Sequence, residues 1–396
     1  MPTGRRVRVA MVHGPGSPDH DGVSDYVHRL MTVLARVDVE ALPVPVRPGG
    51  TGWLPATASA AATIRRHRPD LVHVQFAPAA YRFTGVLGVL PVLLPPTTPL
   101  VTTVHEYGWW SAPGWVPAAV WRPLERARLW DRETGRLVPA SAAVVVSNQQ
   151  HATRLRMRTG KCPTEVPLAP NVDDHFTGGH AAGPGARDGV RRRLGLAPDA
   201  RLLAFFGFVH PVKGLRYAIA ALPALRATRP DLHLLVVGGF TSQALPEPAA
   251  RAFRRELDDL VRQHGVADAV TFTGHVPAAE VSEVLHAADA AVLPFTAGVT
   301  TKSGAVLAAL AHGVPTAVTT ADEPDPQLRD GETVAVIPAR RDAAAVERTV
   351  ARLLDDAALR RRLADGGRRL AFRHSWGRVA AAHRTLYEAV LGSHDG

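Results

Sequence analysis

The 396-residue sequence has very little cysteine, and several common catalytic motifs are missing from it. Cys162 is the only cysteine, which excludes a disulfide framework and a thiolate-rich metal site and favours a reducing, cytoplasmic compartment. No group of histidine, cysteine and acidic residues has the spacing of a zinc site. The sequence has no Gly-x-Ser-x-Gly elbow, and no Gly-x-Gly-x-x-Gly follows a leading strand. These absences argue against an α/β-hydrolase and a dinucleotide oxidoreductase.

The sequence also lacks a hydrophobic run long enough to cross a membrane. The longest apolar stretch, residues 85–94, is broken by Pro91, whereas a spanning helix needs about 20 apolar residues. The basic start of the chain ends at Gly14-Pro15-Gly16, so we interpret residues 7–12 as a first strand rather than as a signal peptide.

Positive charge is in excess in this sequence: the formal net charge is +10 and the pI is near 10.6. The arginines are scattered along predicted helices, and no RNA-binding pattern of interleaved aromatic residues accompanies them. We therefore expect no nucleic-acid partner. A preference for anionic ligands, or a peripheral contact with an anionic membrane, stays open. The oligomeric state is not indicated.

What the sequence does contain is a regular alternation of short β-branched runs and helical patterns, which is typical of βαβ units and parallel sheets. In the first half the predicted strands are residues 7–12, 71–76, 100–104 and 143–147, and the predicted helices are 23–35 and 57–67. In the second half the strands are 202–206, 232–237, 270–272, 290–293 and 316–318, and the helices are 214–228, 249–264, 278–287 and 304–312. Helical patterns fill residues 342–391.

This order predicts an α/β chain of two Rossmann-like, doubly wound domains. We expect an N-terminal domain over residues 1–176, a glycine- and alanine-rich linker over 177–189, and a C-terminal domain over 190–376. Ligands of such sheets bind at the carboxyl ends of the strands, so two facing sheets predict a cleft between them.

A first candidate binding loop follows the predicted strand 202–206. Gly207 makes a turn, and Lys213 comes just before Gly214 and a predicted helix. A helix N-terminus offers unpaired N–H groups and a positive dipole end, and Lys213 adds a compact cation. We interpret the loop as a diphosphate site. The alternative is an exposed lysine at a helix start.

A second loop of this kind follows the predicted strand 290–293. Its glycines, Gly298 and Gly304, permit close backbone approach. Hydroxyls and a charge are supplied by Thr300, Thr301, Lys302 and Ser303. The order Gly-Lys-[Ser/Thr] is absent, so the loop is not a P-loop. Ser303 can equally be the helix N-cap, and a capped helix end is itself an anion site.

Two features of the first half are further candidates. Gly22 follows the first strand and opens a helix, where it could bring backbone N–H groups to the donor phosphates or simply form a turn. His105 directly follows the predicted strand 100–104, at the edge where functional groups collect in open sheets, although a lone strand histidine is more often structural.

Four tryptophans, Trp109, Trp110, Trp115 and Trp121, follow His105. Their rings could stack on an acceptor, pack the loop, or touch a membrane together with nearby arginines. We favour loop packing with an acceptor edge.

Taken in order, these segments resemble the family-4 retaining glycosyltransferases, the glycosyl transferases group 1 family with the GT-B fold, over nearly the whole chain. The resemblance rests on Gly22, Pro69-Asp70-Leu71-Val72-His73, Val101–Glu106, Gly207 with Lys213-Gly214, Thr271–Pro277, Ala288–Pro294, Leu310–Pro315, Ser375-Trp376 and Tyr387.

The resemblance implies roles for individual residues. Lys213 would hold the donor diphosphate, the backbone of Gly274, His275 and Val276 would contact the base, and His105 would lie at the reacting sugar. The final helix, residues 377–396, would complete the N-terminal domain. The family retains anomeric configuration by positioning and charge stabilisation and needs no metal or other cofactor.

Two departures from the family pattern concern the donor pocket. The usual Glu-x7-Glu pair is replaced by Thr300 and Ala308, and alanine cannot accept a hydrogen bond from ribose hydroxyls. The usual arginine after Gly207 is replaced by Phe208, although His210 lies two residues further on and could supply a weaker, pH-dependent charge.

The leading hypothesis is therefore a retaining glycosyltransferase of the hexosyltransferase type, with a nucleotide-sugar donor and a hydroxyl acceptor on a natural product, an aminocyclitol or a cell-envelope glycan. Its predicted catalytic residues are His105, Lys213 and His210. Two alternatives stay open: a pseudo-glycosyltransferase that couples a nucleotide-activated cyclitol, and a catalytically silent subunit that binds a sugar nucleotide.

Overall fold

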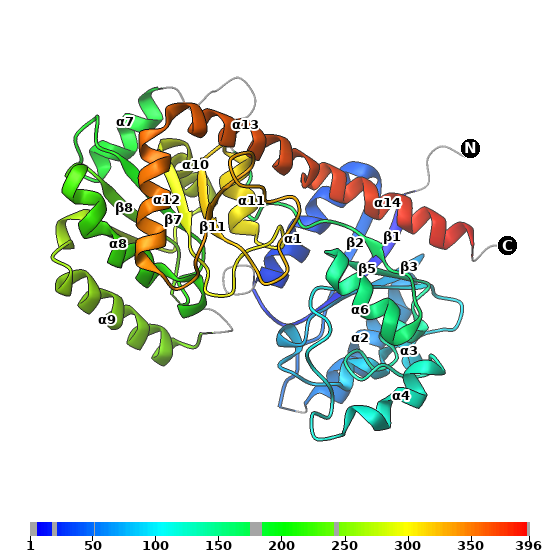
Figure 1. Cartoon of the computed structure of the whole chain (residues 1–396). Helices are drawn as coiled ribbons and strands as arrows, with labels where there is room; N and C mark the ends of the chain where they lie inside the picture. The colour runs from blue at the N-terminus through cyan, green and yellow to red at the C-terminus, as the bar shows by residue number, and fades with distance from the viewer. Residues whose placement is uncertain (1–5, 18–21, 51, 175–183, 241–244, 394–396) are drawn as a thin grey trace. The chain divides into compact units, whose positions relative to one another are not determined.

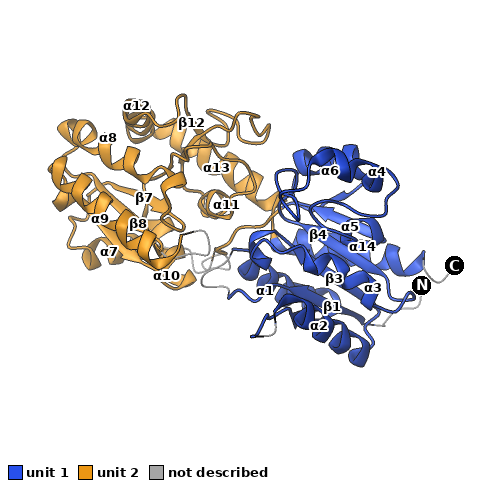
Figure 2. Ribbon diagram, turned by 90° about the horizontal axis from the view of Figure 1, so that it is seen from below, with its two compact units in different colours: residues 1–167, 376–396 blue, residues 168–375 orange. Residues whose placement is uncertain are grey.

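The computed structural model describes residues 6–17, 22–50, 52–174, 184–240 and 245–393. The chain divides into two compact units, coloured separately in Figure 2. Unit 1 consists of residues 1–167 and 376–396, and unit 2 of residues 168–375. Each unit contains a six-stranded parallel sheet, so the expected pair of doubly wound α/β domains is confirmed (Figure 1).

The sheet of unit 1 has the strand order β2-β1-β3-β4-β5-β6. Every residue of β3 and β4 is buried, as expected for central strands of a parallel sheet that is covered on both faces. The strands are β1 (Val7–His13), β2 (Val39–Pro45), β3 (Leu71–Phe76), β4 (Leu100–Val104), β5 (Ala143–Val146) and β6 (Thr164–Glu165). The helices are α1 (Gly22–Leu34), α2 (Trp53–His67), α3 (Leu90–Leu93), α4 (Ala118–Arg126), α5 (Leu137–Ala140), α6 (Gln149–Thr159) and α14 (Trp376–Gly392).

The sheet of unit 2 has the order β12-β11-β10-β7-β8-β9. Its strands are β7 (Leu202–Phe206), β8 (His233–Val237), β9 (Val270–Gly274), β10 (Ala290–Leu293), β11 (Thr316–Thr319) and β12 (Ala335–Ile337). Its helices are α7 (Pro184–Arg193), α8 (Leu215–Thr228), α9 (Glu247–Gln263), α10 (Ala278–Ala287), α11 (Gly304–Ala311), α12 (Ala343–Asp355) and α13 (Ala357–Arg373). From β7 the chain builds the sheet in one direction and from β10 in the other, so a topological switch point lies between β7 and β10.

The predicted linker, residues 177–189, requires a correction. Residues 177–183 lie outside the described part of the chain, but residues 184–189 form the first half of α7, which packs on α10. The helix is held by Arg191, which is fully buried, donates to the carbonyls of Ala200 and Ala287, and pairs with Asp289. An arginine anchor leaves no apolar period, which is why the pattern suggested a linker. The two units divide at Pro167 rather than near residue 177.

Three edge strands also escaped prediction. Pro43 and Pro45 lie in β2, and proline cannot donate to a ladder, but β2 pairs on one side only and accommodates them. The other two, β6 and β12, have only two and three residues. None of the described helices is long and apolar enough to cross a membrane.

Helix α14 belongs to unit 1, where it packs on α1. The ring of Trp376 lies 5.3 Å from that of Tyr26, between centroids. Further along the helix, Tyr387 is fully buried, and its hydroxyl lies 2.6 Å from Nδ1 of His73 in β3. The last helix is therefore an integral part of the first sheet's cover.

Candidate functional site

The two predicted loops of unit 2 meet at the switch point between β7 and β10. A Cβ on Gly214 would lie 1.9 Å from the carbonyl oxygen of Pro294, so only glycine fits there. The backbone N–H of Thr296 donates to the carbonyl of Val212 over 2.9 Å. Because the loops after the two strands touch in this way, they form one surface at the edge of the sheet where ligands of doubly wound folds bind.

Lys213 is the cation of this surface. Its Nζ lies 3.8 Å from the centroid of the Phe295 ring, which gives it a cation–π contact. Burial lowers its pKa from 10.5 to about 8. Within the described ranges no carboxylate forms an ion pair with it. A half-buried ammonium without an anionic partner costs stability, and an anionic ligand would offset this cost.

The start of α11 lies beside the same surface. Gly207, with φ of 120°, would bring a Cβ to 3.4 Å from that of Ala305 in the first turn of the helix. Ser303 is the N-cap, and its Oγ accepts from the N–H of Val306 over 3.4 Å. The positive end of a helix and a lysine thus flank one strand end, which is the arrangement that binds phosphate groups.

The loop before α11 is only partly available to a ligand. Thr301 is buried, and both its N–H and its hydroxyl donate to Asp325, over 2.8 and 2.7 Å, so its hydroxyl serves the structure of the loop. The hydroxyl of Thr300 accepts weakly from the N–H of Lys302 over 3.3 Å. Gly304 packs closely against Asn171, since a Cβ on Gly304 would lie 3.0 Å from that of Asn171.

The predicted base-binding turn lies along the same sheet edge. The N–H of Gly238 donates to the carbonyl of Gly274 over 3.0 Å, and a Cβ on Gly238 would lie 2.1 Å from the carbonyl oxygen of Gly207. Bare backbone therefore continues from the end of β7 across β8 to β9. Beyond it His275 is exposed, and Val276 packs on an apolar cluster.

The two positions that depart from the family pattern have clear structural surroundings. Nδ1 of His210 accepts from the N–H of Val212 over 3.2 Å, so the ring caps the turn that presents Lys213. Ala308 is fully buried in the apolar cluster around Val284 and Val314. At position 308, where the family pattern has a glutamate that contacts the ribose, this chain therefore has an alanine that is tightly packed among apolar side chains.

In unit 1, His105 follows β4 directly. Its Nε2 lies 2.9 Å from the amide oxygen of Gln75, which can only accept, so Nε2 carries the proton and the Nδ1 lone pair is left for another donor. The ring also packs edge-on against Tyr26, with 5.1 Å between centroids. Burial, and secondarily the charge of His383, lower the pKa of His105 to about 4.

Gln75 was not among the predicted site residues, although it joins His105 to a buried network. Its amide nitrogen lies 3.2 Å from Nε2 of His73, which also meets the hydroxyl of Thr103 at 2.7 Å. His73 then reaches Tyr387 in α14. The sequence signal was a second polar residue on the same face of an otherwise apolar strand, in His-Val-Gln-Phe.

Gly22 is the exposed first residue of α1, and a Cβ there would meet nothing within 4 Å. The rest of the predicted loop, residues 18–21, lies outside the described part of the chain. The backbone at Gly22 is therefore exposed, and no neighbouring atom lies so close that only glycine would fit there.

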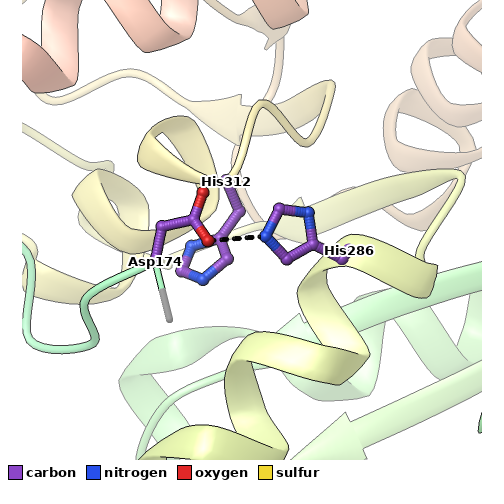
Figure 3. A group of neighbouring side chains, drawn as sticks. All are labelled: Asp174, His286 and His312. Atoms are coloured by element: carbon purple, nitrogen blue, oxygen red, sulfur yellow. Dashed lines mark hydrogen bonds and ion pairs between the residues drawn. The ribbon is translucent and has the colours of Figure 1, made fainter. Parts of the chain in front are cut away.

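One group of side chains could hold a metal ion by its composition. Asp174, His286 and His312 point toward one another in Figure 3, and the ligand atoms of all three lie within 4.8 Å. Nε2 of His286 donates to Asp174 over 2.7 Å, and His312 bonds both Ser282 and the carbonyl of Ala308. These bonds tie the segment entering unit 2 to α10 and α11. Because His312 follows the C-terminal end of α11, the group lies one helix length, about 12 Å, from the N-terminus of that helix.

Comparison with known proteins agrees with this geometry. The family model described as "Glycosyl transferases group 1" matches residues 200–356, which contain β7 to β12. The D-inositol 3-phosphate glycosyltransferase of Streptomyces coelicolor is 27% identical over 98% of this chain and 91% of its own length. The glycogen synthase of Mycobacterium tuberculosis is 31% identical over 83% of this chain and 70% of its own length.

A solved structure shows the same fold. The Anabaena protein HepE, crystallised with UDP and glucose, superposes with a TM-score of 0.71 at 15% identity over 97% of this chain and all of its own. The chain therefore belongs to the glycosyl transferases group 1 family, the family-4 enzymes with the GT-B fold that transfer sugars from nucleotide-sugar donors.

Proposed function

We propose that this chain is a retaining glycosyltransferase that moves a sugar from a nucleoside-diphosphate donor to an acceptor hydroxyl without a metal ion. One observation carries the proposal. Lys213 is half-buried beside the N-terminus of α11, and no carboxylate in the described ranges pairs with it. Such a cation fits a diphosphate. The UDP bound in the HepE crystal structure supports the same kind of ligand.

In the proposed step, the acceptor oxygen bonds to the anomeric carbon on the face that the diphosphate leaves. The bond between that carbon and the diphosphate oxygen breaks, and its electron pair stays on the diphosphate. The acceptor proton passes to a diphosphate oxygen. Lys213 and the first N–H groups of α11 stabilise the charge that develops there, which is the task a metal performs in other transferases.

His105 has a different role in the proposal. Its Nδ1 accepts a hydrogen bond from a hydroxyl of the transferred sugar, while Gln75 holds the ring by its Nε2–H. The pKa of about 4 keeps the imidazole neutral at pH 7, so it orients the sugar and adds no charge.

The donor nucleotide is the least constrained part of the proposal. Buried Ala308 offers no side-chain contact to a ribose, so the diphosphate and the glycine backbone around Gly274 carry more of the donor affinity. We place the reaction in the cytoplasm, where a free thiol such as that of exposed Cys162 persists and nucleotide sugars are made.

Calorimetry with UDP, GDP and dTDP tests the proposal. One of the three should bind, and Lys213→Met should weaken it at least 30-fold, about 2 kcal/mol, because methionine keeps the contact with Phe295 but has no charge. Lys213→Arg is the control that keeps the charge. If the wild-type chain binds none of the three, the proposal is wrong.

The alternatives separate in the same experiment. Binding followed by transfer with retention supports the proposal, and the product is identified by NMR. Donor binding without turnover favours the silent subunit, which the buried Ala308 permits. A product without a glycosidic bond identifies the pseudo-glycosyltransferase.

A further inference from the structure

A pocket of about 710 Å³ lies in unit 1, at the end of the sheet that carries His105. It is formed by residues 83–86, which follow β3, and 109–114, which follow β4, together with Trp130. The volume is within the range of small-molecule sites, about 300–1,000 Å³. Because Trp109 is only four residues beyond His105, the pocket belongs to the region where an acceptor is expected.

The pocket has aromatic walls that are kept open to solvent. Phe83 and Trp109 are 53% and 58% exposed, although aromatic side chains of this size usually stay inside. Their rings lie 6.0 Å apart between centroids at 73°, and Phe83 also meets Trp110 at 6.3 Å. Phe83 thus contacts two tryptophan rings, of which that of Trp109 is exposed and that of Trp110 is half-buried.

The backbone holds this wall in place by an unusual conformation. Arg82 and Phe83 are consecutive non-glycine residues in the left-handed region, with φ of 50° and 58°. This conformation is strained for a bulky side chain, and such strain collects at functional sites. The two loops that line the pocket are also in close contact, since a Cβ on Gly85 would lie 2.7 Å from that of Ala112.

The chemistry of the lining excludes one class of acceptor. None of the residues that line the pocket is charged, and their polar groups are the hydroxyls of Thr84 and Ser111 and the indole N–H groups of Trp109, Trp110 and Trp130. A phosphate in an uncharged pocket would lose hydration without gaining a cation, whereas a neutral hydroxyl could form hydrogen bonds with the hydroxyls of Thr84 and Ser111.

We infer that this pocket binds the acceptor, and that the acceptor is an uncharged molecule with a ring whose apolar face stacks on Phe83 and the neighbouring tryptophans. The inference rests on the proposed function and adds the acceptor class to it. It separates this chain from its relative in Streptomyces coelicolor, whose name gives a phosphorylated acceptor, D-inositol 3-phosphate.

The test compares two acceptors with the whole protein. Phenyl β-D-glucopyranoside is the neutral, ring-bearing probe, and D-inositol 3-phosphate is the anionic one. Binding of each is measured by calorimetry, and transfer is measured with the nucleotide sugar that the donor screen identifies. We expect the neutral probe to bind and to be the better acceptor.

The key variant is Phe83→Asn, because asparagine tolerates the left-handed conformation and removes the ring without a folding penalty. It should raise the KM for phenyl β-D-glucopyranoside at least fivefold while the donor dissociation constant stays the same. Trp109→Ser should act in the same direction. The control is Leu54→Ser on α2 of the same unit. Leu54 is 59% exposed, close to the 58% of Trp109, and its replacement should change neither the acceptor KM nor the donor dissociation constant.

Three results would overturn the inference. The first is no binding of phenyl β-D-glucopyranoside at millimolar concentration, and the second is a higher kcat/KM with D-inositol 3-phosphate. The third is an unchanged acceptor KM in both variants combined with weaker sedimentation with phosphatidylglycerol vesicles, which would make the aromatic wall a membrane contact. Failure of the wild-type chain to bind any donor is a separate result that contradicts the proposed function itself.

Discussion

In unit 2 the functional end of the sheet presents a cation, whereas in unit 1 the corresponding end presents histidines that are kept uncharged. Lys213 has no carboxylate partner in the described ranges, and it packs on the ring of Phe295. His73 and His383 are buried and His105 is half-buried, and burial lowers the pKa of each. The same topology therefore serves two electrostatic purposes.

This contrast matches the division of work in the proposed reaction. There, the diphosphate is met by the positive charge of Lys213 in unit 2, which explains an ammonium without a carboxylate partner. The neutral sugar is oriented by hydrogen bonds, which explains the polar groups that hold one imidazole in unit 1. Each of the following changes removes one side of this contrast.

The largest effect is expected from Gly214→Ala. A Cβ there would meet the Pro294 oxygen at 1.9 Å, and φ is 71°, so we expect a loss of about 4 kcal/mol or more in the free energy of unfolding. Gly22→Ala is the matched control, because a Cβ on Gly22 meets nothing. Urea unfolding followed by circular dichroism measures both. Equal stability of the two variants would contradict the close contact between the loops.

A fall in pH should lower the free energy of unfolding of unit 1. His105 and His383 have a pKa of about 4 in the folded chain and about 6.5 when unfolded, so the unfolded chain binds more protons between these values. Stability is therefore lost as the pH falls below 6.5, by about 2 kcal/mol for each histidine at pH 5. His383→Phe should reduce the loss.

The readout for this acid effect can be confined to one unit. All seven tryptophans lie in unit 1, so their fluorescence follows its unfolding, while far-ultraviolet circular dichroism follows both units. Equal urea midpoints by fluorescence at pH 7 and pH 5 would show that the buried histidines are not held neutral.

Gln75→Leu tests the positioning of His105. Without the amide oxygen the imidazole loses the bond that fixes its Nε2–H, and we expect kcat to fall about 10- to 30-fold, about 2 kcal/mol, with the donor dissociation constant unchanged. Gln75→Glu keeps an acceptor but adds a charge, which should raise the pKa of His105 and shift the acid limb of the kcat profile upward. A normal kcat in the leucine variant would assign Gln75 to folding alone.

The smallest expected effect concerns donor affinity at high pH. Lys213 has a pKa of about 8, so it is largely uncharged at pH 9. If only the charged form binds the diphosphate, the dissociation constant rises about tenfold between pH 7 and pH 9, about 1.4 kcal/mol. Lys213→Arg stays charged and should show a flat profile. A flat profile in the wild-type chain would mean that another group holds the diphosphate.

Much of this architecture was predictable from the sequence because central strands of parallel sheets are continuous apolar runs, as in Leu100–Val104. The two loops at the switch point were also found, since each follows such a strand and opens a helix. The edge strand β2 was missed because its prolines contradict a strand pattern, and α7 was missed because a buried arginine rather than an apolar stripe holds it.

Long-range side-chain bonds explain the remaining errors and omissions at the site. Thr301 lies in a loop whose sequence pattern predicts a ligand contact, but its hydroxyl donates to Asp325, 24 residues further along the chain. Gln75 has the pattern of a structural residue, but the fold brings it to His105. The scarcity of lysine is a further signal in the sequence, because the chain has only three lysines and two of them, Lys213 and Lys302, lie in the two loops at the switch point.

The place of α14 has a consequence for synthesis on the ribosome. Unit 2 is one continuous segment, residues 168–375, and can fold as soon as it has emerged. Unit 1 is interrupted by it, and Tyr387 supplies a bond to His73 from α14, which follows unit 2 in the sequence. The network that holds His105 is therefore completed only after residue 387 has been translated, so unit 1 begins before unit 2 and is completed after it.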